Sequence, residues 1–321
     1  MLKILVLRFS SIGDIVLTTP VVRALKQQLP NAEIHYFTKP SFGIILENNP
    51  YVDKVIFLEK ELWRQLDALK KEKYDFVIDL HHNLRTQIIK FRLGVKNFSF
   101  DKLNFKKWLY VNLKINKLPQ QHVVDRYFET VRLLDVFNDD LGLDYFIPPK
   151  DQVDLRSLPH PFHQGYTAFA IGAQHYTKKL PPDKLVEFCM AIEQPIILLG
   201  GKEDAQIGDE IMHTIFATNG STNIYNACGK YNLNQSASLI QQAELVYTHD
   251  TGLMHIAAAF KKRIVSIWGN TTPAFGMYPY ATNFNVIENN QLSCRPCSKI
   301  GYKKCPQGHF KCMRDLLPKG I

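Results

Sequence analysis

The residues with the clearest chemistry are Asp250, Thr251 and Gly252, in the stretch ELVYTHDTGLMHIAAAF. A short apolar run precedes them and a small apolar helix follows, so they lie where a buried strand ends and a helix begins. Free backbone amides and the positive end of the helix dipole favour an anion such as a phosphate at that position. The same residue types also cap helices that bind no ligand, and the local pattern leaves both interpretations open.

Asp14 occupies a similar loop near the N-terminus, in RFSSIGDIVLTTP. Ser10, Ser11 and Gly13 leave open backbone donors there, and a carboxylate at a cleft edge suits a general base that accepts a hydroxyl proton. Asp14 is equally a residue type that caps a helix. The loop has no glycines in dinucleotide-binding register, which argues against a nicotinamide-dependent oxidoreductase.

Two further loops complete a possible nucleotide site in the second half of the chain. In GAQHYTKKLPP, Thr177 can donate to a phosphate and Lys178 or Lys179 can neutralise it. In GGKED, two glycines permit close approach of a ligand, and Glu203 or Asp204 can bind the hydroxyls of a ribose. Three loops that all end strands therefore predict a bound nucleoside diphosphate.

The C-terminal stretch CRPCSKIGYKKCPQGHFKC holds four cysteines near one histidine, namely Cys294, Cys297, Cys305, Cys312 and His309. The first pair has the spacing of a zinc knuckle, but the later gaps match no standard zinc finger. A structural zinc and a group of reduced thiols both remain open.

Alternating strands and helices must position these loops. Strands are predicted at 2–7, 33–37, 55–58, 76–80, 166–171, 196–199, 244–247 and 263–268, and helices at 14–28, 42–48, 61–71, 123–136, 183–192, 204–216, 234–242 and 253–260. This alternation predicts an α/β protein with two doubly wound parallel sheets that face each other across a cleft. A proline-rich linker at 147–161 divides it into domains at 1–155 and 156–321.

Composition narrows the class of protein. The 321 residues are 45% hydrophobic and carry a formal charge of +9, so we expect a globular protein with an anionic partner. Residues 85–117 concentrate basic and aromatic side chains, which suits a lipid headgroup region, a nucleic acid or an ordinary solvated face. No apolar run is long enough to span a membrane, and the N-terminus is predicted to be a strand instead of a signal peptide, so a cytoplasmic location is expected.

Taken together, RFSSIGDIVLTTPVVRALK, GAQHYTKKLPPDKL, THDTGLMHIAAAF, SIWGNTTP and CRPCSKIGYKKCPQGHFKCM resemble the heptosyltransferases of glycosyltransferase family nine. The resemblance implies a GT-B fold of two Rossmann-like domains, with the acceptor on the first and the nucleotide sugar on the second. It also implies that Asp14 is the base, that Thr177 and Lys178 bind phosphate, and that Asp250, Thr251 and Gly252 hold the diphosphate and the sugar. His255 belongs to the same motif and is included among the substrate-binding residues.

Enzymes of this family move heptose from ADP-heptose to the inner core of lipopolysaccharide, with inversion and without a catalytic metal. The implied partners are therefore ADP-heptose, a phosphorylated lipid A–core acceptor and the inner face of the inner membrane, with no required cofactor and no nucleic acid. The last helix could pack back on the first domain. The chain departs from the family at Leu180 and Trp268, which leaves a transferase for another nucleotide sugar as the alternative. A nucleotide- or nucleic-acid-binding protein without transferase activity is the alternative from a different class. The residues do not determine which heptose is added, the donor base or the oligomeric state.

Overall fold

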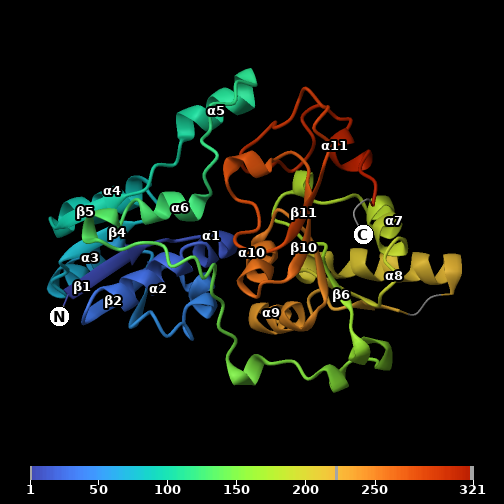
Figure 1. Ribbon diagram of the computed structural model, residues 1–321, viewed down its shortest axis with the longest axis horizontal. Coiled ribbons are helices and arrows are strands. Elements are labelled where there is room, and N and C mark those ends of the chain that lie inside the picture. Colours follow the sequence, from blue (N-terminus) through green and yellow to red (C-terminus); the bar gives the residue numbers. More distant parts are fainter. Residues whose placement is uncertain (1, 221–222, 319–321) are drawn as a thin grey trace. The chain divides into compact units, whose positions relative to one another are not determined.

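A computed structural model of the chain describes residues 2–220 and 223–318 (Figure 1). The chain divides into two compact units. The first comprises Met1–Leu103 and Gln121–Phe146, and the second comprises Asn104–Gln120 and Ile147–Ile321. In the described part of the chain, no helix is both long and apolar enough to cross a bilayer.

The first unit is built on a parallel sheet with strand order β3-β2-β1-β4-β5. Its strands are β1 (Leu2–Leu7), β2 (Ala32–Thr38), β3 (Lys54–Phe57), β4 (Phe76–Asp79) and β5 (Lys96–Ser99). Its helices are α1 (Ile12–Val16), α2 (Thr19–Gln28), α3 (Leu62–Lys71), α4 (Leu84–Leu93) and α6 (Val123–Phe128), with 3₁₀ turns η1 (Pro40–Ile45) and η2 (Arg132–Leu134).

The second unit contains a parallel sheet with strand order β11-β10-β9-β6-β7-β8. Its strands are β6 (Thr167–Ala170), β7 (Ile196–Leu199), β8 (Ile224–Asn226), β9 (Leu245–His249), β10 (Arg263–Trp268) and β11 (Phe284–Glu288). Its helices are α5 (Asn104–Leu113), α7 (Pro182–Met190), α8 (Ala205–Asn219), α9 (Leu233–Gln242), α10 (Gly252–Ala259) and α11 (Lys311–Arg314). Its 3₁₀ turns are η3 (Pro149–Asp151), η4 (Leu155–Ser157), η5 (His160–Gln164), η6 (Tyr176–Lys178), η7 (Lys202–Asp204) and η8 (Pro273–Phe275).

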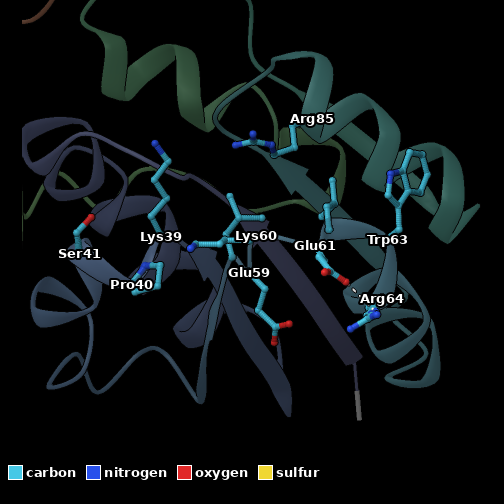
Figure 2. Close-up of a pocket in the computed structure, with 11 residues that line it drawn as sticks. Lys39, Pro40, Ser41, Glu59, Lys60, Glu61, Trp63, Arg64 and Arg85 are labelled. Carbon is cyan, nitrogen blue, oxygen red and sulfur yellow. Dashed lines mark ion pairs between the residues drawn. The ribbon is translucent and has the colours of Figure 1, made fainter.

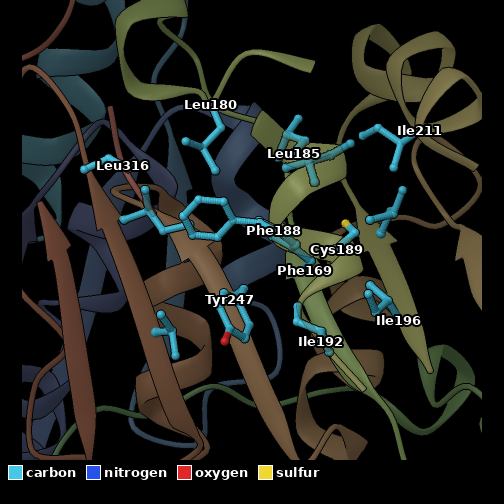
Figure 3. Close-up of a cluster of buried hydrophobic side chains, with 14 of the residues drawn as sticks. Phe169, Leu180, Leu185, Phe188, Cys189, Ile192, Ile196, Ile211, Tyr247 and Leu316 are labelled. Atoms are coloured by element: carbon cyan, nitrogen blue, oxygen red, sulfur yellow. The ribbon is translucent and has the colours of Figure 1, made fainter. Parts of the chain in front are cut away.

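Apolar side chains from strands and helices close the core of each unit. In the second unit, Phe169 of β6 and Tyr247 of β9 pack against Phe188 of α7, and all three are fully buried (Figure 3). Strands that are buried on both faces have continuous apolar sequences, such as IILL in β7. Such runs make these strands predictable from the sequence. The two parallel sheets confirm the predicted α/β class and the two Rossmann-like domains.

One predicted helix is divided in two. The single helix expected at 14–28 is instead α1 and α2, separated at Leu17 and Thr18. Pro20 lies in the first turn of α2, where its missing N–H has no partner to lose. In one continuous helix it would remove a hydrogen bond to Val16, so the chain restarts the helix at that point.

The domain boundary also differs from the expected one at 155/156. The proline-rich segment predicted as a linker forms η3, η4 and η5, which belong to the second unit. Asp151 of η3 is buried and accepts hydrogen bonds from the side-chain amides of Asn232 and Asn234, at 3.0 Å each, at the start of α9. Those bonds tie the segment to α9.

The last helix packs within the second unit, whereas the sequence suggested packing on the first domain. Cys312 and Met313 of α11, with Phe310 and Leu316 beside it, are buried in the same core as Phe169. Figure 3 shows Leu316 among these core side chains. Four apolar side chains within seven residues favour burial of this short helix in the core of its own unit.

Candidate active site

The candidate loops of each unit lie where the strand order reverses. In the first sheet β1 has β2 on one side and β4 on the other, and in the second sheet β6 has β7 on one side and β9 on the other. Loops at the carboxyl ends of the two strands that flank such a reversal diverge and leave a crevice for a ligand. Asp14 follows β1, whereas Lys178 follows β6 and Asp250 follows β9.

Asp14 is held by an arginine that the sequence analysis did not single out. One carboxylate oxygen lies 2.6 Å from Nη2 of Arg8, and the side chain of Asp14 is 22% exposed. Arg8 is buried and also donates to the carbonyls of Ser10 and Leu80 and to the hydroxyl of Tyr127. The guanidinium is thus fixed on three sides. It orients the Asp14 carboxylate, while part of that carboxylate stays exposed and within reach of a substrate hydroxyl.

Ser11 contacts Asp14 directly, Ser10 contacts Arg8, and Gly13 lies inside α1. The second carboxylate oxygen accepts from Oγ of Ser11 at 2.8 Å and from its backbone N–H at 3.1 Å. Gly13 is buried within α1, and the carbonyl of Ser10 is bonded to Arg8. Asp14 is therefore at the third position of a capping box, and its side chain is still 22% exposed, so capping of α1 leaves part of the carboxylate accessible. The two interpretations left open by the sequence are compatible.

The loop after β4 adds a histidine on the same side of the sheet. Asp79 is fully buried, pairs with Nζ of Lys90 at 2.9 Å, and accepts the backbone N–H groups of His81 and His82. Burial and, to a smaller extent, the positive charge of Arg8 lower the pKa of His81 to about 4. His81 is therefore neutral at physiological pH. In the sequence, only the two adjacent histidines after a buried strand mark this loop, and they do not indicate a role for His81.

In the second unit, one lysine joins the loops after β6 and β9. Nζ of Lys178 lies 2.6 Å from the Asp250 carboxylate and 3.2 Å from the Asp250 backbone oxygen. Thr271, in the loop after β10, donates to the same carboxylate at 2.9 Å. The negative charge of Asp250 is thus largely compensated, so it does not repel a nearby phosphate, and its remaining lone pairs can accept sugar hydroxyls.

The N-terminus of α10 carries no side-chain cap. Thr251 is the N-cap residue, but its side chain makes no capping hydrogen bond, and Gly252 begins the helix. The Asp250 carboxylate is engaged by Lys178 and Thr271. Capping by side chains, the alternative interpretation of this stretch, is not realised, and the first backbone amides of α10 are left for an anion. His255 lies buried one turn further along the helix.

The adjacent Lys178 and Lys179 pair with different acids. Lys179 pairs with Asp204 at 3.1 Å, and Asp204 also accepts the backbone N–H of Gly201 at 3.0 Å. Asp204 is 2% exposed, whereas Glu203 is exposed at the surface of the loop. Of the two acids left open by the sequence, Asp204 is a buried structural residue and Glu203 is the one available for a ribose.

The glycine after β7 makes room for Asp204, whereas the sequence analysis assigned that room to a ligand. A Cβ on Gly200 would lie 2.8 Å from Cβ of Asp204, and one on Gly172 would lie 2.3 Å from the Asp204 carboxylate. Both values are far below a normal contact. The two loops therefore approach each other closely around this acid because neither has a side chain at the point of contact.

Thr177 is placed differently from its expected phosphate-binding role. It is 1% exposed, and its hydroxyl accepts the backbone N–H of Tyr302 at 2.8 Å. Its own N–H donates to the carbonyl of the same residue at 3.2 Å. Thr177 thus ties the loop after β6 to the C-terminal segment, and no sequence signal links two residues so far apart.

Two more buried groups support the loops that carry Lys178, Asp250 and Thr271. Nε2 of His249 accepts the backbone N–H of Leu180 at 3.0 Å, and burial lowers the pKa of His249 to about 3, so the ring stays neutral. Arg295 donates to the carbonyl of Thr271 at 2.8 Å and pairs with Glu288 at 2.7 Å. Arg295 thereby fixes the loop that carries Thr271. The analysis of the CRPC motif concerned only its cysteines and did not find this role.

The four tail cysteines are free thiols. Sγ of Cys294 lies 3.9 Å from Nε2 of His309, and burial raises the pKa of Cys312 to about 12. Burial and the neighbouring Cys294 and Cys305 also raise the pKa of Cys297. Within residues 2–220 and 223–318, no three or more His, Cys, Asp and Glu side chains are arranged to hold a metal ion. The thiols as placed do not form a metal centre, and the structural zinc stays a prediction.

The first unit also contains a basic pocket of about 980 Å³ that the sequence analysis did not find. It is lined by the segments after β2 and β3 and by the starts of α3 and α4. Figure 2 shows Arg85 extending toward the side on which Lys39 lies, and Lys60 pointing into the same space. Arg64 pairs with Glu61 at 2.8 Å, which leaves Lys39, Lys60 and Arg85 against Glu59, so positive charge is in excess in the pocket lining. These features suit an anionic ligand.

Comparison with known proteins gives consistent results. The model of the family "Glycosyltransferase family 9 (heptosyltransferase)" matches residues 62–307. The chain is 26% identical to lipooligosaccharide heptosyltransferase 2 of Haemophilus influenzae, over 99% of this chain and 96% of that protein. It is 26% identical to lipopolysaccharide heptosyltransferase 1 of Campylobacter coli, over 89% of each.

The structure superposes on that of E. coli ADP-heptose LPS heptosyltransferase II with a TM-score of 0.72, at 20% identity, covering 99% of this chain and 96% of that one. This likeness concerns the fold. Because the family model covers well over half of the sequence, the chain belongs to glycosyltransferase family 9 and is a glycosyltransferase.

Proposed function

We propose that this enzyme transfers heptose from ADP-heptose to the inner core of lipopolysaccharide. The observation that carries the proposal is the arrangement of Lys178, Asp250 and Thr271 beside the uncapped start of α10. It offers a cation and backbone amides to a diphosphate and a compensated carboxylate to a sugar. The identity of the transferred sugar is inferred from relatives of similar length that are named heptosyltransferases.

The proposed mechanism is a single displacement with inversion. Asp14 accepts the proton of an acceptor hydroxyl, whose oxygen attacks the anomeric carbon as the bond to ADP breaks. Lys178 and the amides at the start of α10 stabilise the negative charge that builds on the leaving diphosphate. Glu203 binds the ribose of the donor. Arg8 holds the carboxylate of Asp14 in place through the ion pair, and His81 in the loop after β4 stays neutral.

The basic pocket of the first unit supports a phosphorylated acceptor. Lys39, Lys60 and Arg85 concentrate positive charge there, at the same carboxyl edge of the sheet as Asp14. A phosphorylated lipid A–core would place its anionic groups among these cations while a sugar hydroxyl reaches the base. Because such an acceptor is anchored in a membrane, we propose that the enzyme works in the cytoplasm at the inner face of the inner membrane.

The direct test follows release of the nucleoside diphosphate from a panel of nucleotide sugars, with a lipopolysaccharide-core acceptor that lacks the added sugar. We expect release to be fastest with ADP-heptose and to depend on the acceptor. Faster transfer from another nucleotide sugar would assign the enzyme a different donor. Donor-dependent release with no acceptor requirement would contradict the transferase mechanism.

We further propose that no metal takes part in the chemistry and that any zinc on the tail cysteines is structural. Metal analysis of protein purified without chelator, combined with turnover after metal removal, separates these roles. A stoichiometric zinc that turnover requires, in protein whose fold is intact without it, would contradict a metal-independent reaction.

A further inference from the structure

Helix α5 has no buried residue along its ten positions. In Figure 1 it lies between two extended connections. A helix with so little burial gains almost no hydrophobic stabilisation from its own chain, so its exposed side chains call for another explanation.

The side of α5 that contacts the rest of the second unit is polar and basic. The ring of Tyr110 packs edge-on against Phe275 at 6.1 Å, and Nζ of Lys107 lies 6.0 Å from the same ring. Just beyond the helix, Nζ of Lys114 donates to the carbonyl of Cys294 at 3.0 Å and to that of Pro296 at 2.8 Å. These residues recur at helical spacing and define one face.

The opposite side of α5 is apolar and exposed. Phe105 is 71% exposed, Trp108 is 52% exposed and Leu113 is 54% exposed. The rings of Phe105 and Trp108 stack on each other, with centroids 6.4 Å apart and planes inclined by 11°. Ile115, just past the helix, is 46% exposed. A surface helix of a globular protein usually turns its apolar side inward, so α5 is oriented the opposite way.

Positive charge surrounds this apolar face. Residues 101–117 contain the lysines Lys102, Lys106, Lys107, Lys114 and Lys117, and the single acid Asp101. Exposed aromatic and aliphatic side chains flanked by lysines match the boundary between the acyl chains and the headgroups of a bilayer that contains anionic lipids.

We propose that α5 and residues 114–117 dock the enzyme on an anionic bilayer, with Phe105, Trp108 and Leu113 in the headgroup–acyl boundary and the exposed Lys106 and Lys117 among the phosphates. The proposal rests on the proposed function, since a lipid-anchored acceptor gives the docking its purpose. The proposal identifies α5 as the element that contacts the bilayer. The contacts of Lys114 and Tyr110 with the second unit fix the orientation of that helix.

The observations favour a bilayer over a nucleic acid. Leu113 and Ile115 have no ring to stack and gain only from an apolar environment.

The test measures binding of the full-length enzyme to vesicles of phosphatidylcholine alone and of phosphatidylcholine mixed with phosphatidylglycerol. We expect binding to the mixed vesicles, with weakening at high salt and a blue shift of the tryptophan fluorescence that the variant without Trp108 lacks. Replacing Phe105→Ser together with Trp108→Ser should lower the partition coefficient at least about tenfold, because the anchoring side chains are lost. Neither side chain is buried, so this variant should fold like the wild type.

The matched control is Met190→Ser with Phe216→Ser, two exposed apolar side chains elsewhere in the same unit, at 47% and 58% exposure. It should bind vesicles like the wild type. Equal binding of the α5 variant and the wild type would overturn the proposal, as would failure of the wild type to bind mixed vesicles. Binding to RNA without binding to vesicles would assign the helix to the rival partner.

Activity assays keep this proposal separate from the proposed function. With a deacylated, water-soluble core acceptor, the Phe105→Ser, Trp108→Ser variant should turn over like the wild type. With the acceptor embedded in mixed vesicles, its rate at low enzyme concentration should fall with its binding. If the wild type transfers nothing to either acceptor, the proposed function fails, and vesicle binding still decides the role of α5.

Discussion

Replacing Asp14→Asn tests the proposed base most directly. The amide keeps the size of the side chain and one oxygen, but it cannot accept a proton from a substrate hydroxyl. Loss of a general base lowers turnover by about two to four orders of magnitude, equivalent to about 3–5 kcal/mol in the activation barrier. Donor affinity should be unchanged, because the residues proposed to bind the donor all belong to the second unit.

The same substitution affects stability, and the structure bounds the effect. The side chain of Arg8 is 9% exposed and would lose its ionic partner, which costs about 3–5 kcal/mol for a fully buried pair. Asp14 is partly exposed, and Arg8 retains bonds to Ser10, Leu80 and Tyr127, so we expect about 1–3 kcal/mol.

Asp139→Asn is the matched control for that loss. Asp139 pairs with Arg23 at 2.7 Å with similar exposure, 18% for the acid and 2% for the arginine, but it lies outside the candidate loops. Arg23 keeps Asp144, so the control should cost no more stability than Asp14→Asn and should leave turnover intact. Release of ADP, donor titration by calorimetry and denaturant unfolding provide the three readouts. A drop in turnover of less than tenfold in folded Asp14→Asn would show that Asp14 only caps α1.

Three further predictions concern the second unit. Thr251→Ala should change the donor dissociation constant by less than about threefold, because its side chain makes no capping bond, whereas Gly252→Val should weaken binding more than about tenfold by obstructing the amides; equal affinities in calorimetry would place the diphosphate elsewhere. Glu203→Gln should weaken donor binding without altering the free energy of unfolding, whereas Asp204→Asn should lower that free energy by about 1–3 kcal/mol, since it breaks the buried pair with Lys179; the reverse pattern would exchange the two roles. His249 has a folded-state pKa of about 3 against an ordinary value of 6.5, so its contribution to stability is complete above pH 6.5 and declines by about 1.4 kcal/mol per pH unit as the pH falls toward 3. The unfolding free energy of His249→Asn should therefore depend less steeply on pH between 6 and 4, and identical slopes would show that the ring titrates normally in the fold.

Sequence reasoning located the loops well because the strands that precede them are buried. The apolar runs before Asp14, Lys178 and Asp250 can only be interior strands, and turn residues mark where each ends. It failed for strands at or near a sheet edge: β5 reads KNFS and β8 reads IYN, too short and too polar to show a pattern.

The sequence could not assign partners across long separations. Nothing local indicates that Lys178 pairs with Asp250 while the next lysine pairs with Asp204, because the choice depends on how three loops converge. Arg8 was missed for a different reason. It lies in the same loop as Asp14, but an arginine after a strand suggests exposure until the surrounding carbonyls are known. The expected phosphate-binding role of Thr177 came from its residue type in the loop and from the family resemblance, whereas its bonds to Tyr302 give it a structural role.

Helix α5 belongs to the second unit although its residues lie between two segments of the first unit, and this has a consequence for folding during synthesis. Helix α5 leaves the ribosome early, but the carbonyl of Cys294 that anchors Lys114 lies 180 residues further along. At about 5–20 residues per second, that interval lasts roughly 10–40 s. A ten-residue helix is marginal on its own in water, so α5 has no stable docking surface on its own chain during this time. Its ordering therefore marks the end of assembly of the second unit, and amide protection in α5 reports when the nascent enzyme is complete.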